Sequence, residues 1–195
     1  MIILIIWILG FSVVNDISNY IDWKIGKKKE ENKKTDLKEK ITSFSLKQFS
    51  DKFTLTLKGE TAEITEEQKK TTIKSPTLSL KTSEEIIEIT TGKGGKAEIK
   101  MNPEERKIER IVMTGDIRIV NRNRKTGEII MEATCGKLIY DNKTQTMIME
   151  ISPQIKRGKN SFSGEKIFYR LKDNTLEIRG KVNVHIYPAE KANSD

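Results

Sequence analysis

Cysteine and histidine each occur only once in this 195-residue chain, as Cys135 and His185. One cysteine excludes an internal disulfide framework and a multi-cysteine zinc site, and one histidine excludes a His–His metal pair. A single histidine also disfavours a Ser–His–Asp catalytic triad. The composition therefore predicts a protein that is not an enzyme, that uses no metal and no cofactor, and in which both residues are structural.

Proline and glycine are also scarce, with four and 12 residues, which argues against a collagen-like or linker-like chain. Apolar residues make up 35% and charged residues 33%, which favours a folded domain over wholesale disorder. The formal net charge of +8 favours an anionic partner: nucleic acid, phospholipid headgroups or a phosphorylated glycolipid. Aromatic residues, at 6%, are too few and too scattered to favour a nucleic-acid reader.

The N-terminal segment is the one long apolar run. Residues 1–14 are apolar or glycine except for Ser12 and, as a helix, would span about 21 Å, less than the roughly 30 Å of a bilayer core. Extension to residue 23 would bring Tyr20 and Trp23 to headgroup level. We therefore expect residues 1–23 to form a membrane anchor helix. A secretory signal and a buried core helix are the alternatives.

The next segment, residues 24–42, is rich in lysine and is expected to be a polar tether. A polybasic patch on the membrane surface is the alternative reading. The positive-inside tendency would place these lysines in the cytoplasm, so charge alone does not settle the sidedness of the anchor.

The remaining chain shows alternation with period two. Phe53, Leu55 and Leu57 alternate with polar residues, and about ten later segments of four to eight residues behave in the same way. These segments are rich in isoleucine, threonine and valine and are bounded by turn-forming residues, which indicates antiparallel strands. We predict an all-β domain over residues 43–188, followed by a flexible tail at residues 189–195.

The β domain contains an internal repeat. A glycine, fifteen residues and a Ser-Pro pair recur in two of its copies, and the unit reads as strand, polar turn, strand and break. A single hairpin cannot bury its apolar face, so the copies are expected to stack as a barrel, a jelly roll or a solenoid. The copies cover residues 59–76, 136–153, 164–180 and, more loosely, 95–116.

From Thr114 to Ile186 the order of short motifs resembles the OstA-like domain of lipopolysaccharide-transport proteins. The motifs are Gly115-Asp116-Ile117, Ala133, Tyr140-Asp141, Pro153, Gly164 with Ile167 and Tyr169, and Gly180 with Val182 and Val184. The similarity covers about residues 43–187. With an N-terminal apolar segment and a tether before it, the chain most resembles the LptC family.

This resemblance implies an OstA-like twisted β-jelly roll behind a single transmembrane helix, anchored in the inner membrane with the β domain in the periplasm. It implies that the protein receives lipopolysaccharide from the inner-membrane ABC transporter and holds the acyl chains in an apolar groove. It would then pass them to a periplasmic LptA-type bridge protein by edge-strand addition, with Val182 and Val184 at one end and Phe53 and Leu55 at the other. A soluble LptA-type protein and a tethered scaffold or adhesin without lipid cargo remain alternatives.

Alternation assigns the side chains that face inward, each of which is also a candidate for ordinary core packing. The predicted groove residues are Phe53, Leu55, Leu57, Ile73, Leu78, Ile99, Ile117, Ile119, Ile129, Met131, Leu138, Tyr140, Ile148, Ile155, Phe162, Ile167, Tyr169, Ile178, Val182 and Val184. Cations near two turns could form charge-assisted hydrogen bonds with the phosphates of the glycolipid headgroup, or could be solvated charges at the rim of the domain. They are Arg118, Arg122, Arg124, Lys156 and Arg157.

Overall fold

The structure is a computed structural model that describes residues 37–65, 70–102, 104–105 and 107–187. In these residues the chain forms fourteen strands and no helix, which confirms the all-β prediction. The strands are β1 (Leu37–Phe49), β2 (Thr54–Thr65), β3 (Lys70–Lys74), β4 (Thr77–Lys81), β5 (Glu85–Thr91), β6 (Lys96–Asn102), β7 (Lys107–Asn123), β8 (Ile129–Asp141), β9 (Thr146–Glu150), β10 (Gln154–Arg157), β11 (Asn160–Ser163), β12 (Lys166–Arg170), β13 (Thr175–Arg179) and β14 (Asn183–His185).

The predicted anchor at residues 1–23 and the predicted tail at residues 189–195 lie outside the described residues. Within the part of the chain that the structure describes, there is no helix of the length and apolarity that a membrane crossing needs. The anchor therefore stays a prediction from the sequence.

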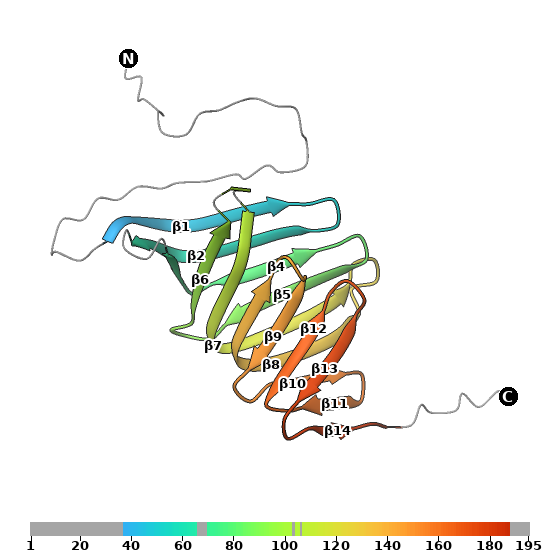
Figure 1. The fold of residues 1–195 in the computed structure, drawn as a ribbon. Helices are drawn as coiled ribbons and strands as arrows, with labels where there is room; N and C mark the ends of the chain where they lie inside the picture. The colour runs from blue at the N-terminus through green and yellow to red at the C-terminus, as the bar shows by residue number, and fades with distance from the viewer. Residues whose placement is uncertain (1–36, 66–69, 103, 106, 188–195) are drawn as a thin grey trace, which may run out of the picture.

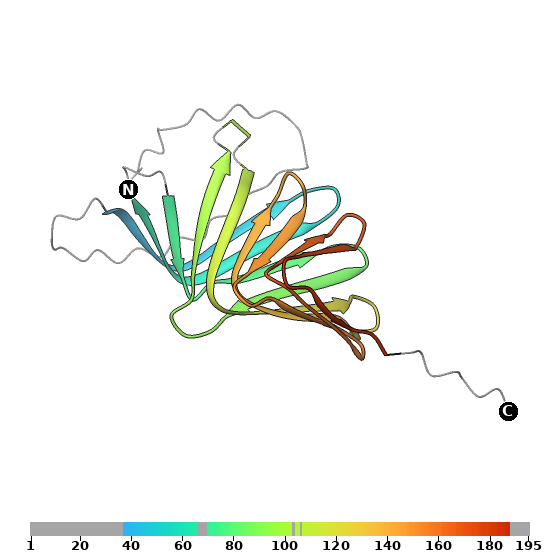
Figure 2. The same ribbon diagram turned by 60° about the horizontal axis from the view of Figure 1, so that its bottom comes forward.

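The strands form two layers that are joined by bends in the longest strands (Figures 1 and 2). Residues 107–114 of β7 pair with β6, whereas residues 117–123 pair with β5, and the register shifts between the two halves. We call the layer with β3, β6, β9, β12 and β13 layer A, and the layer with β4, β5, β10, β11 and β14 layer B. Strands β1, β2, β7 and β8 run through both layers.

Apolar side chains from both layers form one core between them. In β4 and β5 every second residue is buried, because successive side chains of a strand point to opposite faces. Full burial of a leucine or isoleucine side chain contributes about 1.5–3 kcal/mol, so the contact between the layers is the main source of stability.

Glycines stand where the chain crosses between the layers. A Cβ at Gly136 would lie 2.7 Å from Cγ2 of Ile151, and a Cβ at Gly164 would lie 2.5 Å from Cγ2 of Ile178. Gly59 makes the same close approach to Ile73. Three copies of the predicted repeat thus place their first glycine against an isoleucine of the returning strand, so the sequence repeat corresponds to a structural one.

The boundary between tether and β domain needs correction. Strand β1 begins at Leu37, so residues 37–42 of the predicted tether belong to the sheet. The reason lies at Ser43, which has a φ of 55°. Because of this bend, two residues instead of one separate buried Ile41 from buried Phe44. The alternation that predicts a strand is therefore interrupted within β1.

We predict that Gly59→Ala destabilises the domain by about 1–3 kcal/mol, because overpacking forces backbone shifts. The new Cβ would lie 2.8 Å from the backbone oxygen of Lys74, which cannot move without the strand. Urea unfolding monitored by circular dichroism measures the change. Glu60→Ala, at an exposed neighbouring position, is the control and should change stability by less than about 0.5 kcal/mol. Equal stability of the two variants would contradict the prediction.

Candidate functional site

Most of the predicted groove residues lie in the core between the layers. Thirteen of them are at most 5% exposed: Leu55, Leu57, Ile73, Leu78, Ile99, Ile117, Ile119, Met131, Leu138, Tyr140, Ile155, Ile167 and Tyr169. Three more are partly buried and pack against the core, namely Phe53, Phe162 and Ile178. The structure therefore brings sixteen of the twenty residues to one apolar interior.

The other four lie elsewhere. Ile148 points to the outer face of layer A, because Met147 and Met149 on either side of it are the buried residues of β9. Ile129 is 48% exposed at the start of β8, where the register with β7 shifts. Val182 (55% exposed) precedes β14, and Val184 (41% exposed) lies in β14, whose one partner among the described strands is β11.

The interior is closed in this structure. Its side chains belong to one buried cluster, so the predicted furrow is not open to solvent along the thirteen buried residues. Four methionines are among the fully buried residues: Met113, Met131, Met147 and Met149. Flexible methionine side chains can adapt to a guest of variable shape, but a guest needs the two layers to separate.

A line of polar residues joins the layers on the side away from the bends. We call it the seam and define it by Gln48, Glu85, Asn121, Arg157, Tyr169 and Asn174. One bridge is a single hydrogen bond. The backbone N–H of Ile108 in layer A donates to Oε1 of Gln48 in layer B at 2.8 Å, and Gln48 is buried.

The second bridge is a cluster around Tyr169. Asn121 Nδ2 of layer B donates to Glu85 Oε2 at 2.8 Å and, more weakly, to Tyr169 Oη of layer A at 3.4 Å. Tyr169 Oη in turn donates to Asn174 Oδ1 at 2.9 Å. Arg157 Nη2 of layer B donates to the same oxygen at 2.9 Å, and its guanidinium lies 5.4 Å from the Tyr169 ring centre.

The seam is incompletely satisfied. Oδ1 of Asn121 and Nε of Arg157 are buried and have no hydrogen-bond partner. A buried polar atom without a partner costs about 1–3 kcal/mol, and water would satisfy it if the layers parted. Parting of the layers would therefore relieve this cost at the seam.

Burial also perturbs the titration of interior groups. It raises the pKa of the Cys135 thiol to about 12. It raises the pKa of Tyr169 as well, with a further contribution from the carboxylate of Glu85. Among the described residues no group of His, Cys, Asp and Glu side chains is arranged to hold a metal ion.

The predicted phosphate-binding cations do not converge on one site. Arg118 and Arg122 lie on the outer face of layer B, where Arg118 Nη2 pairs with Glu132 Oε1 at 2.8 Å. Lys156 is exposed beside Glu132 in the neighbouring strand, and Arg157 belongs to the seam.

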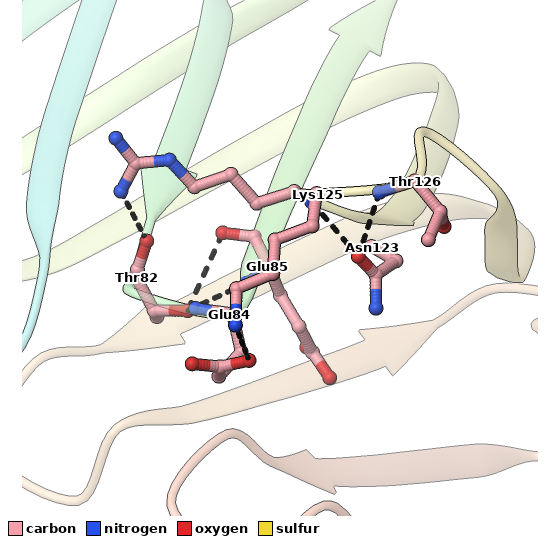
Figure 3. Close-up of polar contacts among 7 residues, drawn as sticks. Thr82, Glu84, Glu85, Asn123, Lys125 and Thr126 are labelled. Atoms are coloured by element: carbon pink, nitrogen blue, oxygen red, sulfur yellow. Dashed lines mark hydrogen bonds and ion pairs between the residues drawn. The ribbon is translucent and has the colours of Figure 1, made fainter.

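The fifth cation, Arg124, holds two turns together. Figure 3 shows the turn that contains Asn123, Lys125 and Thr126 lying against the β4–β5 turn. Arg124 Nη1 donates to the backbone oxygen of Thr82 at 2.9 Å, and Lys125 Nζ lies 3.8 Å from Glu84 Oε2. Arg124 therefore has a structural contact within layer B.

The sequence analysis missed the seam. One signal was present at Asn121, which falls at an inward position in line with Ile117 and Ile119. A polar residue at such a position needs a buried partner. The partners come from distant parts of the chain, so alternation alone could not identify them.

We predict that the free energy of unfolding falls as the pH rises above about 8.5. The unfolded thiol ionises near pH 8.5, whereas folded Cys135 stays protonated until about pH 12, so the folded state holds more protons in this range. The thiol alone should lower stability by about 2 kcal/mol between pH 7 and pH 10. Urea unfolding at several pH values measures this slope, and Cys135→Ala should reduce it. An unchanged slope in the variant would contradict the prediction.

Comparison with known proteins connects this geometry to a family. A family model described as "Lipopolysaccharide-assembly, LptC-related" matches residues 1–187. The crystal structure of LptH, the LptA homologous periplasmic component of the conserved lipopolysaccharide transport device from Pseudomonas aeruginosa, has a similar fold. It gives a TM-score of 0.53 at 13% identity and covers 69% of this chain and 95% of that chain. No curated protein gives a match. Since the family model covers nearly the whole sequence, the chain belongs to the LptC-related family of lipopolysaccharide-assembly proteins.

Proposed function

We propose that this protein is a non-enzymatic carrier that holds the acyl chains of lipopolysaccharide between layers A and B. The observation that supports this role is the apolar interior, which both layers build and which the polar seam closes on the side away from the bends. Family membership supports the same class of cargo.

The energetics of acyl chains require such an interior. Burial of one methylene group is worth about 0.8 kcal/mol, so exposure of a chain of about twelve carbons to water costs on the order of 9 kcal/mol. If the seam opens, acyl chains replace contacts between apolar side chains of the two layers. This exchange is close to neutral, so the protein can take up and release its cargo.

The ends of the fold suit assembly with domains of like fold. In the described residues β1 pairs only with β2 at one end, and β13 and β14 each have one partner strand at the other. Unpaired edges can accept a strand from another chain. We propose that these edges contact the inner-membrane ABC transporter complex and an LptA-type bridge protein. Leu55 is not an edge residue, because β1 and β4 flank β2, and Phe53 lies in the turn between β1 and β2. In this proposal β1 takes their role as the edge.

The proposed location is the inner membrane, with residues 1–23 as a single-pass anchor and the β domain in the periplasm. The support for the anchor is the apolar N-terminal sequence with Tyr20 and Trp23 at its end. Acyl chains would thus move from the membrane to the bridge through this domain.

A photo-crosslinking experiment tests the carrier role. A diazirine analogue of methionine at Met149, which is fully buried, should form an adduct with labelled lipopolysaccharide. The same analogue at Ile148, the adjacent residue on the outer face of β9, is the matched control and should form none. Mass spectrometry identifies the adducts.

Tyr169→Phe adds a kinetic arm to this experiment. It removes the hydroxyl that bridges Asn121 and Asn174, worth about 0.5–1.5 kcal/mol, so adducts at Met149 should form roughly 2- to 12-fold faster. Equal labelling at Met149 and Ile148, or no adduct at Met149 in the folded protein, would refute the proposed function.

A further inference from the structure

The outer faces of the two layers differ in how their charges are paired. On layer A, cations lie opposite carboxylates of neighbouring strands at distances of 2.6–3.5 Å. Such cross-strand pairs neutralise this face locally. The pairs are Lys74–Glu63, Lys100–Glu109, Arg110–Asp141, Lys137–Glu150 and Lys166–Glu150.

On the outer face of layer B most cations have no such partner among the described residues. We call this face the basic face and define it by Lys47, Lys58, Lys81, Arg118 and Arg122, from strands β1, β2, β4 and β7. Arg118 pairs with Glu132, but the other four form no ion pair with any carboxylate in the described ranges. Lys47 Nζ instead lies 5.7 Å from the centre of the Phe49 ring.

The basic face surrounds a hollow of about 840 Å³. Hydroxyl side chains line it between the cations, and the register sets one row as Ser45, Lys58, Thr77, Thr90 and Arg118 on five successive strands. Among the described residues that line the hollow, Glu88 is the one with a carboxylate. Ser79 Oγ, in the next row, is buried and has no hydrogen-bond partner. The lining therefore offers cations and hydroxyl donors to an anion.

The spacing of the cations indicates an extended partner. Neighbouring strands lie about 4.8 Å apart, so cations on β1, β2, β4 and β7 are spread over most of the width of the layer. A single phosphate needs donors that converge on one point, whereas the headgroups of a membrane surface present many phosphates across an area.

We propose that the basic face docks the β domain onto the anionic phospholipid headgroups of the membrane that holds its N-terminal segment. This inference rests on the proposed function for its anchor. Residues 24–36 lie between the predicted anchor and β1, and fully extended they would reach at most about 45 Å. The domain is thus within reach of the surface, and docking would control when it is free to contact its bridge partner.

Docking should depend on charge and on salt. Each cation near an anionic surface contributes about fivefold to the ratio of docked to undocked domain. The effect should weaken as salt rises from 0.1 M to 1 M, because the screening length falls from about 10 Å to about 3 Å.

Fluorescence quenching in vesicles tests this proposal. The full-length protein is reconstituted into phosphatidylcholine vesicles with or without phosphatidylglycerol, each containing a lipid with a quencher on its headgroup. A fluorophore is attached through Thr134→Cys, an exposed position on the outer face of layer B beside Arg118, or through Thr114→Cys on the outer face of layer A. Buried Cys135, with its raised thiol pKa, stays unlabelled.

We expect stronger quenching at Thr134 than at Thr114, only with phosphatidylglycerol and only at low salt. The variant Lys58→Gln, Lys81→Gln, Arg122→Gln should lower the docked-to-undocked ratio by tenfold or more. The matched control Lys93→Gln, Lys143→Gln, Lys172→Gln removes three exposed turn charges and should leave the ratio unchanged. Equal quenching at both positions, or equal loss in both triple variants, would overturn the proposal.

Two further arms separate the alternatives. The first arm is flotation of the protein with phosphatidylglycerol vesicles. If the wild-type protein floats at 0.1 M salt but leaves the vesicles at 1 M, residues 1–23 do not anchor it and the proposed anchor is wrong. If, in that case, the triple variant with Lys58→Gln loses the low-salt flotation and the control triple variant keeps it, the basic face is supported. Sodium phosphate is compared with sodium chloride at equal ionic strength. If phosphate displaces the domain far better than chloride, the face is a site for a single phosphate and the membrane proposal is wrong.

Discussion

The apolar contact between the inner faces of the two layers is the interaction on which the other features depend. It requires the long strands to bend while the apolar side chains stay on the inner face. Gly59 and Gly136 lie at these bends, and their lack of a side chain lets the backbone approach Ile73 and Ile151 of the returning strands closely. Because bends join the layers on one side, separation is possible only on the other. Buried Gln48 and Asn121 lie there, and their hydrogen bonds replace apolar packing.

This arrangement reconciles a stable fold with the proposed carrier role. Continuous backbone at the bends keeps the layers together, while the seam depends on a few hydrogen bonds and contains two unsatisfied polar atoms. Interior methionines can adapt to a guest without a fixed pocket. The outer faces differ, since five ion pairs join neighbouring strands on layer A, whereas Lys58 and Lys81 on layer B have no carboxylate partner among the described residues.

Much of the inner face was predictable from the sequence, because polar neighbours set the phase of Ile117 and Ile119. At Ile148 the sequence does not show which side chains face inward, since Met147 and Met149 are also apolar and all three can be buried. Strand β1 escaped prediction because Ser43 interrupts its alternation. The seam depends on pairs such as Gln48 and Ile108, 60 residues apart, and only the assembled sheet brings them together.

The distance across the seam during lipid binding tests the central claim most directly. Spin labels at Ser83→Cys in layer B and Lys172→Cys in layer A report this distance by pulsed electron resonance, and labels at Lys93→Cys and Ser152→Cys report the side of the bends. We predict that lipopolysaccharide lengthens the first distance and leaves the second unchanged. Stoichiometric binding of lipopolysaccharide with no change across the seam would contradict the account.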